Sequence, residues 1–377
     1  MHRIQLHYSL LREDAIGPIR NPLIELLQAV STQGSISGAA RALDFSYRHV
    51  WGELKRWEGE LGEQLIVWEK GQPARLTPFG AKLMWAERQA QARLQPQIEA
   101  LRTELERTYA VAFDPSAHVL SFHASHDASL AALREQARPR RLHLDIHFTG
   151  SVDAIRALNE GRCTMAGFHT RLTPAPGSLT QRSYKPLLRP GLHKLIGFAR
   201  RVQGLIVAPG NPLQLHTPGD LCRDGIRFIN RARGSGTRLL FDELLAEHGI
   251  AAQDIQGYGH EEPSHAAIAQ AIAAGMADAG IGIEATARAQ GLGFVPLAEE
   301  HYHLACLKST LTQPATVALL ALLRDHAWQQ RLAQLPGYTP ERSGEVLPMS
   351  RILPWWQFRA RKGRQAPQAL SSTAPPP

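Results

Sequence analysis

The segment from residue 22 to residue 80 constrains the fold more than any other part of this 377-residue chain. Its first helix is indicated by apolar residues at helical spacing, Leu23, Leu26, Leu27 and Val30. Ser35 should cap a short second helix and Ser46 a third. The small residues Ala39 and Ala40 stand where two helices must approach closely. This order of helix, tight turn and helix predicts a helix-turn-helix.

A short hairpin, or wing, should follow these helices. Its strands are expected at Leu65–Trp68 and Arg75–Thr77, joined by a turn at Gly71–Pro73. Thr77 followed by Pro78 then indicates the start of a new helix, because proline is tolerated at the first helical position.

The third helix, Ser46–Glu58, is expected to enter the major groove of double-stranded operator DNA. Its exposed leading residues are Ser46, Tyr47, Arg48, His49 and Trp51. Arg48 could pair with guanine or only with phosphate. Phosphate contacts are expected from the basic residues Arg41, Lys55, Arg56 and Arg75. A small helical bundle with charged faces is the alternative, and the order of helices, wing and capped helix favours DNA binding over it.

The stretch GSISGAARALDFSYRHVWGELKRWE, with LTPFG after it, resembles the DNA-binding domain of the ModE family of molybdate-responsive regulators, which is related to the LysR type. The SYRHVW segment is closer to ModE than to ordinary LysR proteins. The resemblance covers about residues 20–80. The wing departs from the family pattern, since it lacks the glycine-rich insertion common in ModE.

Residues 79–109 are expected to continue as one long helix, kinked at Pro96. The helix carries a short heptad seam of apolar residues, Leu94, Ile98, Leu101 and Leu105. We expect a second copy of the chain to cover this seam, in a homodimer or homotetramer, because a symmetric partner also explains two half-sites on DNA. Packing against the chain's own C-terminal domain is the alternative.

Between residues 117 and 340, short apolar strands alternate with helices, which is typical of a parallel α/β sheet. Small, hydroxylated or basic residues stand at the strand-to-helix junctions: Ser125, His126, Gly150, Ser151, Ser235, Gly236, Thr237, Arg238, Ser264 and His265. Helix N-termini bind anions because unpaired N–H donors and the positive end of the helix dipole face the ligand. We therefore expect these residues to line an anion site. Taken singly, serine or threonine at a helix start is usually only a cap.

The GSGTR segment, residues 234–238, gives the strongest of these signals. Its two glycines permit close approach of the backbone, and Arg238 adds a fixed charge. The segment is not a P-loop, because the lysine and the spacing of that motif are missing.

The segments GLIVAPGNP, RFINRARGSGTRLLFDELL, SHAAIAQAIAAGMADAGIGIEATA and GLGFVPLAEEHYHLAC resemble the periplasmic-binding-protein-like domain of some molybdate-type regulators and of certain molybdopterin-biosynthesis proteins. The resemblance runs over roughly residues 117–340. It implies two α/β lobes joined by crossing strands, with a small oxyanion between them. Molybdate or tungstate is the implied effector. Formate or another small carboxylate is the rival, since Arg238, His126 and His265 could supply positive charge.

Composition excludes several classes of protein. The net charge is +8, but residues 351–377 hold five basic residues and no acidic ones, so overall basicity is weak evidence for DNA binding. Cys163, Cys222 and Cys306 form no CxxC pair and the histidines are scattered, so we expect no disulfide framework, metal site or cofactor. We see no signal-peptide layout and no run of 18 apolar residues, which predicts a cytoplasmic protein with no membrane partner.

We expect four parts: a winged helix-turn-helix at 1–80, a linker and dimerisation helix at 81–112, a two-lobed α/β sensing domain at 113–345, and a basic, proline-rich, disordered tail at 346–377. Together they predict a DNA-binding transcriptional regulator that senses a small oxyanion. An enzyme or accessory protein of molybdenum cofactor metabolism is the alternative, but we find no catalytic nucleophile–base pair and no nucleotide loop. A solute-binding protein would need a signal peptide.

Overall fold

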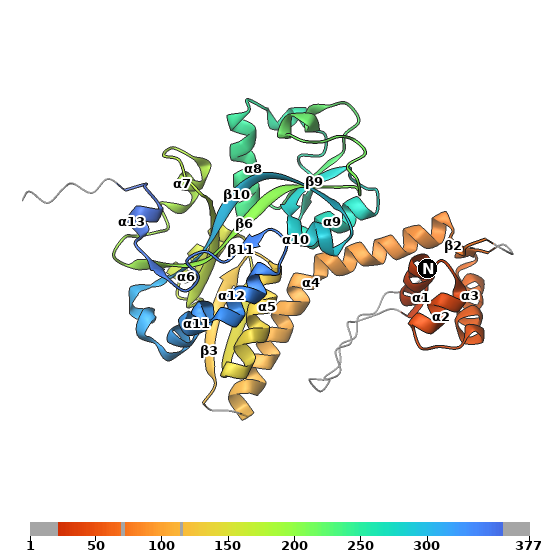
Figure 1. Ribbon diagram of the computed structural model, residues 1–377, viewed down its shortest axis with the longest axis horizontal. Helices are drawn as coiled ribbons and strands as arrows, with labels where there is room; N and C mark the ends of the chain where they lie inside the picture. Colours follow the sequence, from red (N-terminus) through yellow and green to blue (C-terminus); the bar gives the residue numbers. More distant parts are fainter. Residues whose placement is uncertain (1–21, 69–71, 114–115, 357–377) are drawn as a thin grey trace, which may run out of the picture.

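The computed structural model describes residues 22–68, 72–113 and 116–356. The N-terminal domain stands at one end of the molecule (Figure 1) and consists of α1 (Pro22–Gln33), α2 (Ile36–Ala42), α3 (Tyr47–Leu61), β1 (Ile66–Val67) and β2 (Arg75–Leu76). The strands β1 and β2 pair antiparallel as the wing. The tip of the wing, residues 69–71, lies outside the described residues.

The caps of the N-terminal domain are those that the sequence predicts. Ser35 Oγ accepts a hydrogen bond from Gly38 N at 3.0 Å, and Ser46 Oγ accepts one from His49 N at 3.1 Å. Thr77 Oγ1 accepts from Gly80 N at 3.0 Å at the start of the next helix. The apolar stripes meet in one core that includes Leu27, Val30, Ala39, Val50 and Leu54, each fully buried.

One long helix, α4 (Pro78–Phe113), joins this domain to the rest of the chain and changes direction part-way along its length (Figure 1). Pro96 lies inside α4 and has no N–H to offer the carbonyl of Ala92, one turn earlier. The hydroxyl of Ser264 donates to that carbonyl instead, at 3.2 Å. The bend is thus explained by a proline whose missing hydrogen bond is replaced from the C-terminal domain.

The C-terminal domain is built on one curled sheet. Its strands are β3 (His118–Ala124), β4 (Leu142–Phe148), β5 (Met165–Arg171), β6 (His193–Val207), β7 (Phe228–Arg231), β8 (Glu261–Glu262), β9 (Ala279–Ile283), β10 (Gly293–Leu307), β11 (Tyr338–Thr339) and β12 (Val346–Leu347). The main order is β4-β3-β5-β10-β6-β9-β7-β8. Parallel pairing holds β3 to β4 and β5, and β7 to β8 and β9.

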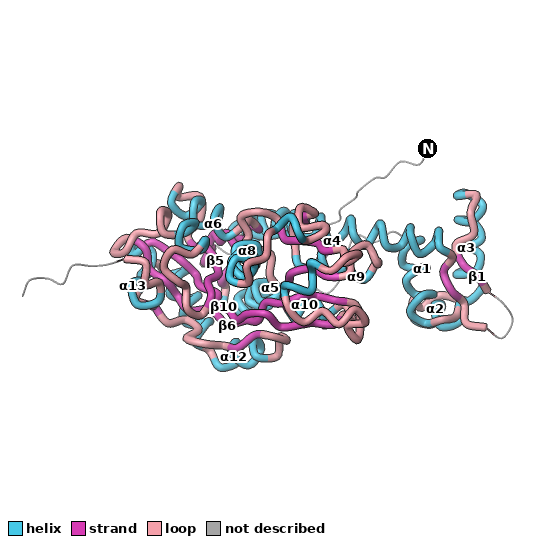
Figure 2. The backbone as a smooth tube through the Cα atoms, turned by 90° about the horizontal axis from the view of Figure 1, so that it is seen from above, coloured by secondary structure: helices cyan, strands magenta, loops and turns pink. Residues whose placement is uncertain are grey.

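Two long strands, β6 and β10, pair antiparallel and run between the two parallel groups (Figures 1 and 2). Lobe 1 is the group β3, β4 and β5, and lobe 2 is the group β7, β8 and β9. The two-lobed α/β fold with crossing strands is therefore confirmed. The expected parallel sheet holds within each lobe, and the crossing strands make the sheet mixed.

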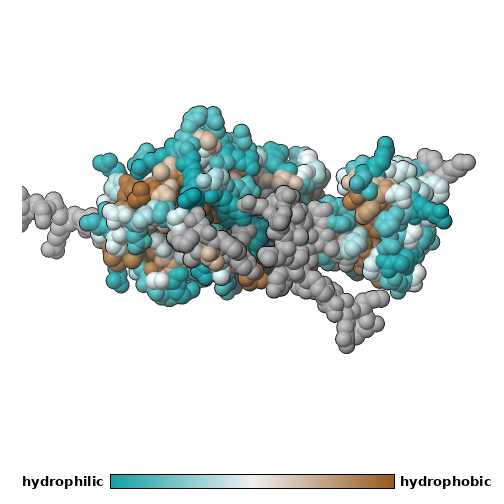
Figure 3. Space-filling view, turned by 90° about the horizontal axis from the view of Figure 1, so that it is seen from below, coloured by the Kyte–Doolittle hydropathy of each residue, from teal (hydrophilic) through white to brown (hydrophobic). Residues whose placement is uncertain are grey.

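Helices cover both faces of each lobe, which gives each lobe two apolar cores. They are α5 (Ala128–Ala137), α6 (Ser151–Asn159), α7 (Leu179–Tyr184), α8 (Gly236–Glu247), α9 (His265–Ala273), α10 (Glu284–Ala289), α11 (Pro314–Arg324), α12 (His326–Ala333) and α13 (Met349–Ile352). Short 3₁₀ turns lie at Arg138–Arg140, Pro218–Cys222, Ala252–Asp254 and Lys308–Thr312. The face seen in Figure 3 is mainly hydrophilic, with hydrophobic residues in scattered groups.

Residues 346–356 pack against lobe 1, although we expected the tail to begin at 346. The strand β12 pairs with β6, and Leu347, Leu353 and Trp355 are buried in the core under α6 and α7. Their apolar side chains explain why this segment is folded. Residues 357–377, which hold most of the expected tail, lie outside the described residues.

Candidate functional site

The leading residues of α3 face solvent, as a DNA-reading helix requires. Tyr47, Arg48 and His49 are exposed, and Ser46 is occupied as the helix cap. Arg41 at the end of α2 and Arg75 on β2 are exposed beside them. Among the described residues, Arg41, Arg48 and Arg75 form no ion pair, so their charges remain available to phosphate.

The side chains further along α3 are already engaged. Trp51 is half-buried, and its ring meets that of Trp68 edge-on at a centroid distance of 6.3 Å. Lys55 Nζ lies 2.6 Å from Glu58 Oε2 and 4.8 Å from the centre of the Trp51 ring. Arg56 pairs with carboxylates before and after it on the same helix, those of Glu53 and Glu60. Lys55 and Arg56 would have to exchange these partners to contact DNA.

In the C-terminal domain, the predicted junctions of lobe 1 and lobe 2 meet. A Cβ on Gly150, at the start of α6, would lie 2.7 Å from Gly234 O. One on Gly236, at the start of α8, would lie 3.1 Å from both Ser151 Oγ and His169 Cβ. Glycine at these two positions therefore lets the N-terminal ends of α6 and α8 touch across the boundary between the lobes.

A buried polar group of side chains lies at this boundary, and we call it the interlobe cluster. Each member is at most 7% exposed. The members are Ser125, Asp127, Ser151, His169, Arg201, Gln203, Arg231, Thr237, His265, Glu300 and Tyr302. They come from both lobes and from the crossing strands β6 and β10.

One arginine of the cluster is fully paired. Arg201 donates to Asp127 and to Glu300. The hydroxyl of Tyr338 also donates to Asp127, at 2.7 Å. Burial is the main influence on the pKa of the Glu300 carboxyl and raises it.

The second arginine, Arg231, is different. Its guanidinium donates to the backbone oxygen of Glu262 at 2.9 Å, but its Nε has no partner. Burial, followed by repulsion from Arg201, lowers the pKa of Arg231 to about 10. Burial also holds the pKa of His169 and His265 well below the ordinary value, with Arg201 and Arg231 adding to the effect, so both imidazoles are neutral at pH 7.

Several cluster atoms lack a hydrogen-bond partner although they are buried. They are Ser125 Oγ, His169 Nε2, Gln203 Oε1, Arg231 Nε, His265 Nδ1, Glu300 Oε2 and Tyr302 OH. Buried polar atoms are normally paired, because an unpaired one keeps its desolvation cost. Such a concentration of unpaired atoms between two lobes fits a place where a small polar ligand is held.

The structure divides the predicted ligand residues into two groups. Gly150, Ser151, Gly236, Thr237, His265 and Ser125 lie in or against the cluster. Arg238 lies at its edge and pairs with Asp242 and Glu261 at 3.0 and 3.1 Å. Its guanidinium also stacks on the Tyr258 ring, so its charge is already compensated.

The remaining predicted hydroxyls serve the helices. Ser235 Oγ caps α8 and donates to Ala232 O at 2.8 Å. Ser264 Oγ caps α9 and donates to α4. His126 Nε2 lies 3.4 Å from Glu99 Oε2 of α4. Ser264 and His126 thus contact the linker helix.

Sequence reasoning missed the residues that carry most of the cluster's charge. Arg201 and Gln203 are buried two residues apart in the long strand β6, and Arg231 ends the buried strand β7. Polar residues at even spacing inside a buried strand are the signal that could have found the first two. Glu300 lies on β10 opposite Arg201, a pairing that only the register of the two strands reveals.

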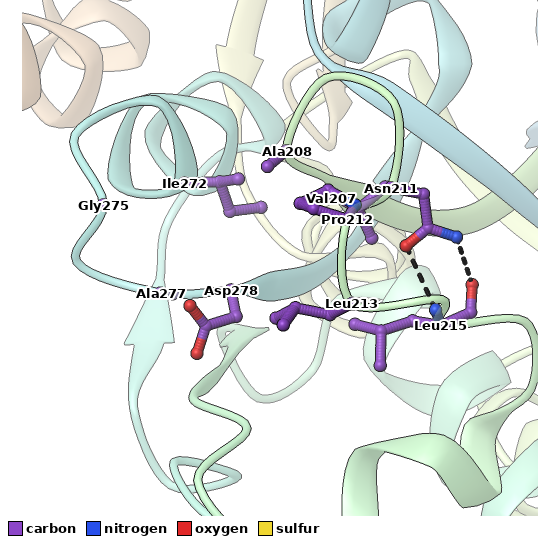
Figure 4. Close-up of a pocket in the computed structure, with 10 residues that line it drawn as sticks. All are labelled: Val207, Ala208, Asn211, Pro212, Leu213, Leu215, Ile272, Gly275, Ala277 and Asp278. Atoms are coloured by element: carbon purple, nitrogen blue, oxygen red, sulfur yellow. Dashed lines mark hydrogen bonds between the residues drawn. The ribbon is translucent and has the colours of Figure 1, made fainter.

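A separate surface pocket of about 250 Å³ lies on lobe 2, between the loop after β6 and the end of α9 (Figure 4). Asn211 holds this loop by donating to Leu215 O at 2.9 Å and accepting from Leu215 N at 3.0 Å. None of the predicted ligand residues lines it. Within the described ranges, no group of three or more His, Cys, Asp or Glu could hold a metal, and no helix is long and apolar enough to cross a membrane.

Two parts of the chain match the models of known families. Residues 131–324, just over half of the chain, match the family model of the PBP superfamily domain. The chain belongs to the PBP superfamily. Residues 23–81 match the bacterial regulatory helix-turn-helix protein model of the lysR family. This PBP superfamily member therefore carries a lysR-family helix-turn-helix domain ahead of its PBP-like domain.

Two curated relatives of this PBP superfamily member are named as uncharacterised proteins. YvgK of Bacillus subtilis is 32% identical over 200 residues, a match that covers 53% of this chain and 64% of YvgK. A protein from the 5′ region of a 2Fe-2S ferredoxin gene of Clostridium pasteurianum is 31% identical over 110 residues, which cover 29% of this chain and 97% of that protein.

The chain also shows weak similarity to several solved structures. The OxyR C206 mutant of Corynebacterium glutamicum is 17% identical to this chain, with a TM-score of 0.40. The match covers 82% of this chain and 93% of the OxyR chain. CbnR in complex with its target DNA is 16% identical, with a TM-score of 0.36. That match covers 78% of this chain and 95% of the CbnR chain. A phosphate-bound substrate-binding protein of a Clostridium perfringens transporter is 14% identical, with a TM-score of 0.46. That match covers 59% of this chain and 99% of the other chain.

Proposed function

We propose that this regulator binds a small anion in the interlobe cluster and that the bound anion changes its affinity for operator DNA. Arg231 carries the proposal, because its side chain is buried and its Nε has no partner. A buried cation is costly unless it is paired. Folding has already removed the Arg231 guanidinium from water, so an anion that binds against it does not add this desolvation cost.

Molybdate and tungstate are the first candidates for the effector, because the sequence resembles molybdate-type regulators. Formate or another small carboxylate is the rival. A carboxylate effector needs a positive charge to pair with. Arg238 is already paired with two carboxylates of the protein. Arg231 is therefore the arginine that would pair with the effector. The neutral imidazoles of His169 and His265 and the hydroxyl of Ser125 would add hydrogen bonds to either kind of anion.

The linker helix α4 gives the route from the cluster to the DNA-binding domain. The carboxylate of Glu262, whose backbone oxygen holds Arg231, accepts from Arg93 Nε of α4 at 2.8 Å. Further along α4, Arg107 donates to Asp145 at 2.8 Å. Glu262 is on β8 and Asp145 on β4, the two edge strands of the sheet. A change in the separation of the lobes would therefore move both anchors of α4.

The apolar seam of α4 supports self-association. Its residues stay exposed although α4 packs on its own sensing domain: Leu94 39%, Ile98 39%, Leu101 54% and Leu105 39%. One side of α4 contacts β4 and α9, which agrees with packing against the chain's own domain. The seam stays exposed, so a second copy of the chain could still cover it. We propose that a second copy covers the seam and brings two helix-turn-helix domains to one operator.

A mobility-shift titration with DNA upstream of the protein's own gene tests this function. We expect retention of that fragment at protein concentrations that leave random DNA free, and a shifted midpoint when molybdate, formate or phosphate is added. Specific binding that none of these anions alters would leave a DNA-binding protein without the proposed anion response. Equal binding to both DNA fragments would contradict operator recognition.

A further inference from the structure

The interlobe cluster holds unpartnered hydrogen-bond acceptors as well as donors. Gln203 Oε1 and Glu300 Oε2 have no partner, and their side chains are 0% and 1% exposed. They lie on the neighbouring strands β6 and β10, where Gln203 Nε2 donates to Glu300 Oε1 at 2.9 Å. The cluster therefore needs a donor at this point, whereas Arg231 Nε needs an acceptor.

The neighbours of Gln203 fix the orientation of its amide. Glu300 Oε1 accepts a hydrogen bond from Arg201 Nε, so it acts as an acceptor and the amide nitrogen must face it. The same nitrogen donates to Thr237 Oγ1 at 2.9 Å. Both amide hydrogens are then in use, and the oxygen is the atom of Gln203 that is left over.

An oxyanion without a proton, such as sulfate or molybdate, offers only acceptors. It would take the hydrogen bonds of Arg231 and of the neutral imidazoles of His169 and His265. It would leave Gln203 Oε1 unpaired and would bring negative charge toward Glu300. Each of these effects weakens binding, because an unpaired buried acceptor keeps its desolvation cost and like charges repel.

We propose that the effector carries a hydrogen-bond donor of its own, which it gives to Gln203 and Glu300 while its negative charge lies against Arg231. This inference rests on the proposed function, that the interlobe cluster binds an anion. The effector class is a small anion that retains a proton or a hydroxyl group. Hydrogen phosphate and hydroxycarboxylates such as glycolate are simple members. This inference ranks them above molybdate, tungstate and formate, the candidates that the sequence resemblance suggests, because those three anions lack the donor.

Isothermal titration calorimetry of the full chain with two matched pairs of anions tests the inference. Phosphate is compared with sulfate, and glycolate with acetate, at neutral pH. We expect the member with a donor to bind at least about tenfold more tightly in one pair or both. The Gln203→Met variant removes the free acceptor and should reduce that ratio. Arg233→Gln, at a side chain that is 84% exposed near the cluster, is the control and should leave it unchanged.

Several results would overturn the inference. Equal affinity within both pairs contradicts it. If sulfate and phosphate bind with equal affinity, and the affinity for sulfate increases as the pH falls, the proton is on Glu300 and not on the ligand. A wild-type preference that survives in both Gln203→Met and Glu300→Gln would place the donor elsewhere. If Gln203→Met does not fold, as judged by thermal unfolding, the wild-type ratios alone decide.

The same titrations separate this inference from the proposed function. Tight binding of molybdate, tungstate or formate, with weak binding of phosphate and glycolate, removes the inference and keeps the anion-binding function. The absence of binding by every anion tested removes both. Donor-dependent binding that is lost in Arg231→Gln supports both together.

Discussion

The proposed DNA-binding face and the interlobe cluster both contain arginines that could pair with anions, but these arginines differ in exposure. Arg48 on α3 is exposed, whereas Arg231 between the lobes is 2% exposed. An exposed cation costs little to maintain and attracts a long polyanion in a salt-dependent way. A buried cation is costly and is screened little by salt, so it suits one small anion of defined shape. Exposure, rather than charge, distinguishes the two sites.

The largest expected effect is on self-association. It tests whether operator binding requires a second copy of the chain while anion binding does not. Ile98→Glu combined with Leu101→Glu puts charges into the seam of α4. Burying each of the original side chains is worth about 1.5–3 kcal/mol, so the dimer should dissociate. Sedimentation velocity should show monomers with weaker operator binding and unchanged anion affinity. Val317→Glu, at an exposed apolar position of α11, is the control. An unchanged oligomer would move the interface elsewhere.

Arg231→Gln should separate the two sites most sharply. Removing the buried charge should weaken anion binding by about 2–5 kcal/mol. Because Arg231 is far from the helix-turn-helix in the chain and lies in the other domain, operator affinity without anion should not change. Calorimetry gives the first quantity and a mobility shift the second. Anion affinity equal to that of wild type would contradict the role of Arg231.

Arg48→Ala is the reciprocal test on the DNA-binding face. Operator binding should weaken by about 1–3 kcal/mol if Arg48 reads a base. Binding to random DNA should then fall less, and anion affinity should stay the same. Equal losses on both DNAs would show that Arg48 contacts only phosphate. No loss on either DNA would contradict the assignment of α3.

Glu262→Gln should leave both sites in place and weaken the connection between them. The backbone oxygen that holds Arg231 remains, but the charged contact with Arg93 of α4 is lost. Coupling between two sites is typically about 1–3 kcal/mol, and most of it should disappear. The measurement is the operator midpoint with and without anion. A full response in this variant would place the route elsewhere than Glu262.

The smallest effects should separate a ligand hydroxyl from a helix cap. Ser125 Oγ is buried and unpartnered, so Ser125→Ala should weaken anion binding by about 0.5–3 kcal/mol. Ser235 Oγ already donates to Ala232 O and caps α8. Ser235→Ala should instead lower the free energy of unfolding by about 1 kcal/mol and leave anion affinity unchanged. Calorimetry and thermal unfolding give both values, and the reverse pattern would contradict the assignment of the two hydroxyls.

These two regions also show what could be learned from the sequence. The helix-turn-helix depends on contacts close in sequence, so cap residues such as Ser35, Ser46 and Thr77 are visible in the pattern and are confirmed. The two-lobed fold came from a resemblance and is confirmed as well. Each junction could be read as a helix start, but a cap and a ligand contact have the same local pattern. That ambiguity placed the capping residues Ser235 and Ser264 among the expected ligand residues. Arg238 was chosen for its charge, and its pairing with Asp242 and Glu261 could not be seen in the local pattern.

The rest of the cluster depends on contacts that local patterns do not encode. Arg201 meets Asp127 and Glu300 only because β6 and β10 cross between the lobes. The contact of Ser264 with Ala92 depends on Pro96, which withdraws the normal hydrogen bond inside α4. The consequence of the proline for a distant serine appears only in three dimensions.

The central claim is that an anion in the interlobe cluster and DNA on the helix-turn-helix influence each other's binding. Thermodynamic linkage requires this influence to be reciprocal. Phosphate, formate and molybdate should each be titrated by calorimetry into the wild-type protein, alone and saturated with its own upstream DNA. For an anion that binds, we predict that DNA changes its dissociation constant by the same factor by which that anion changes the dissociation constant of the DNA. Equal anion affinity with and without the DNA would contradict the account.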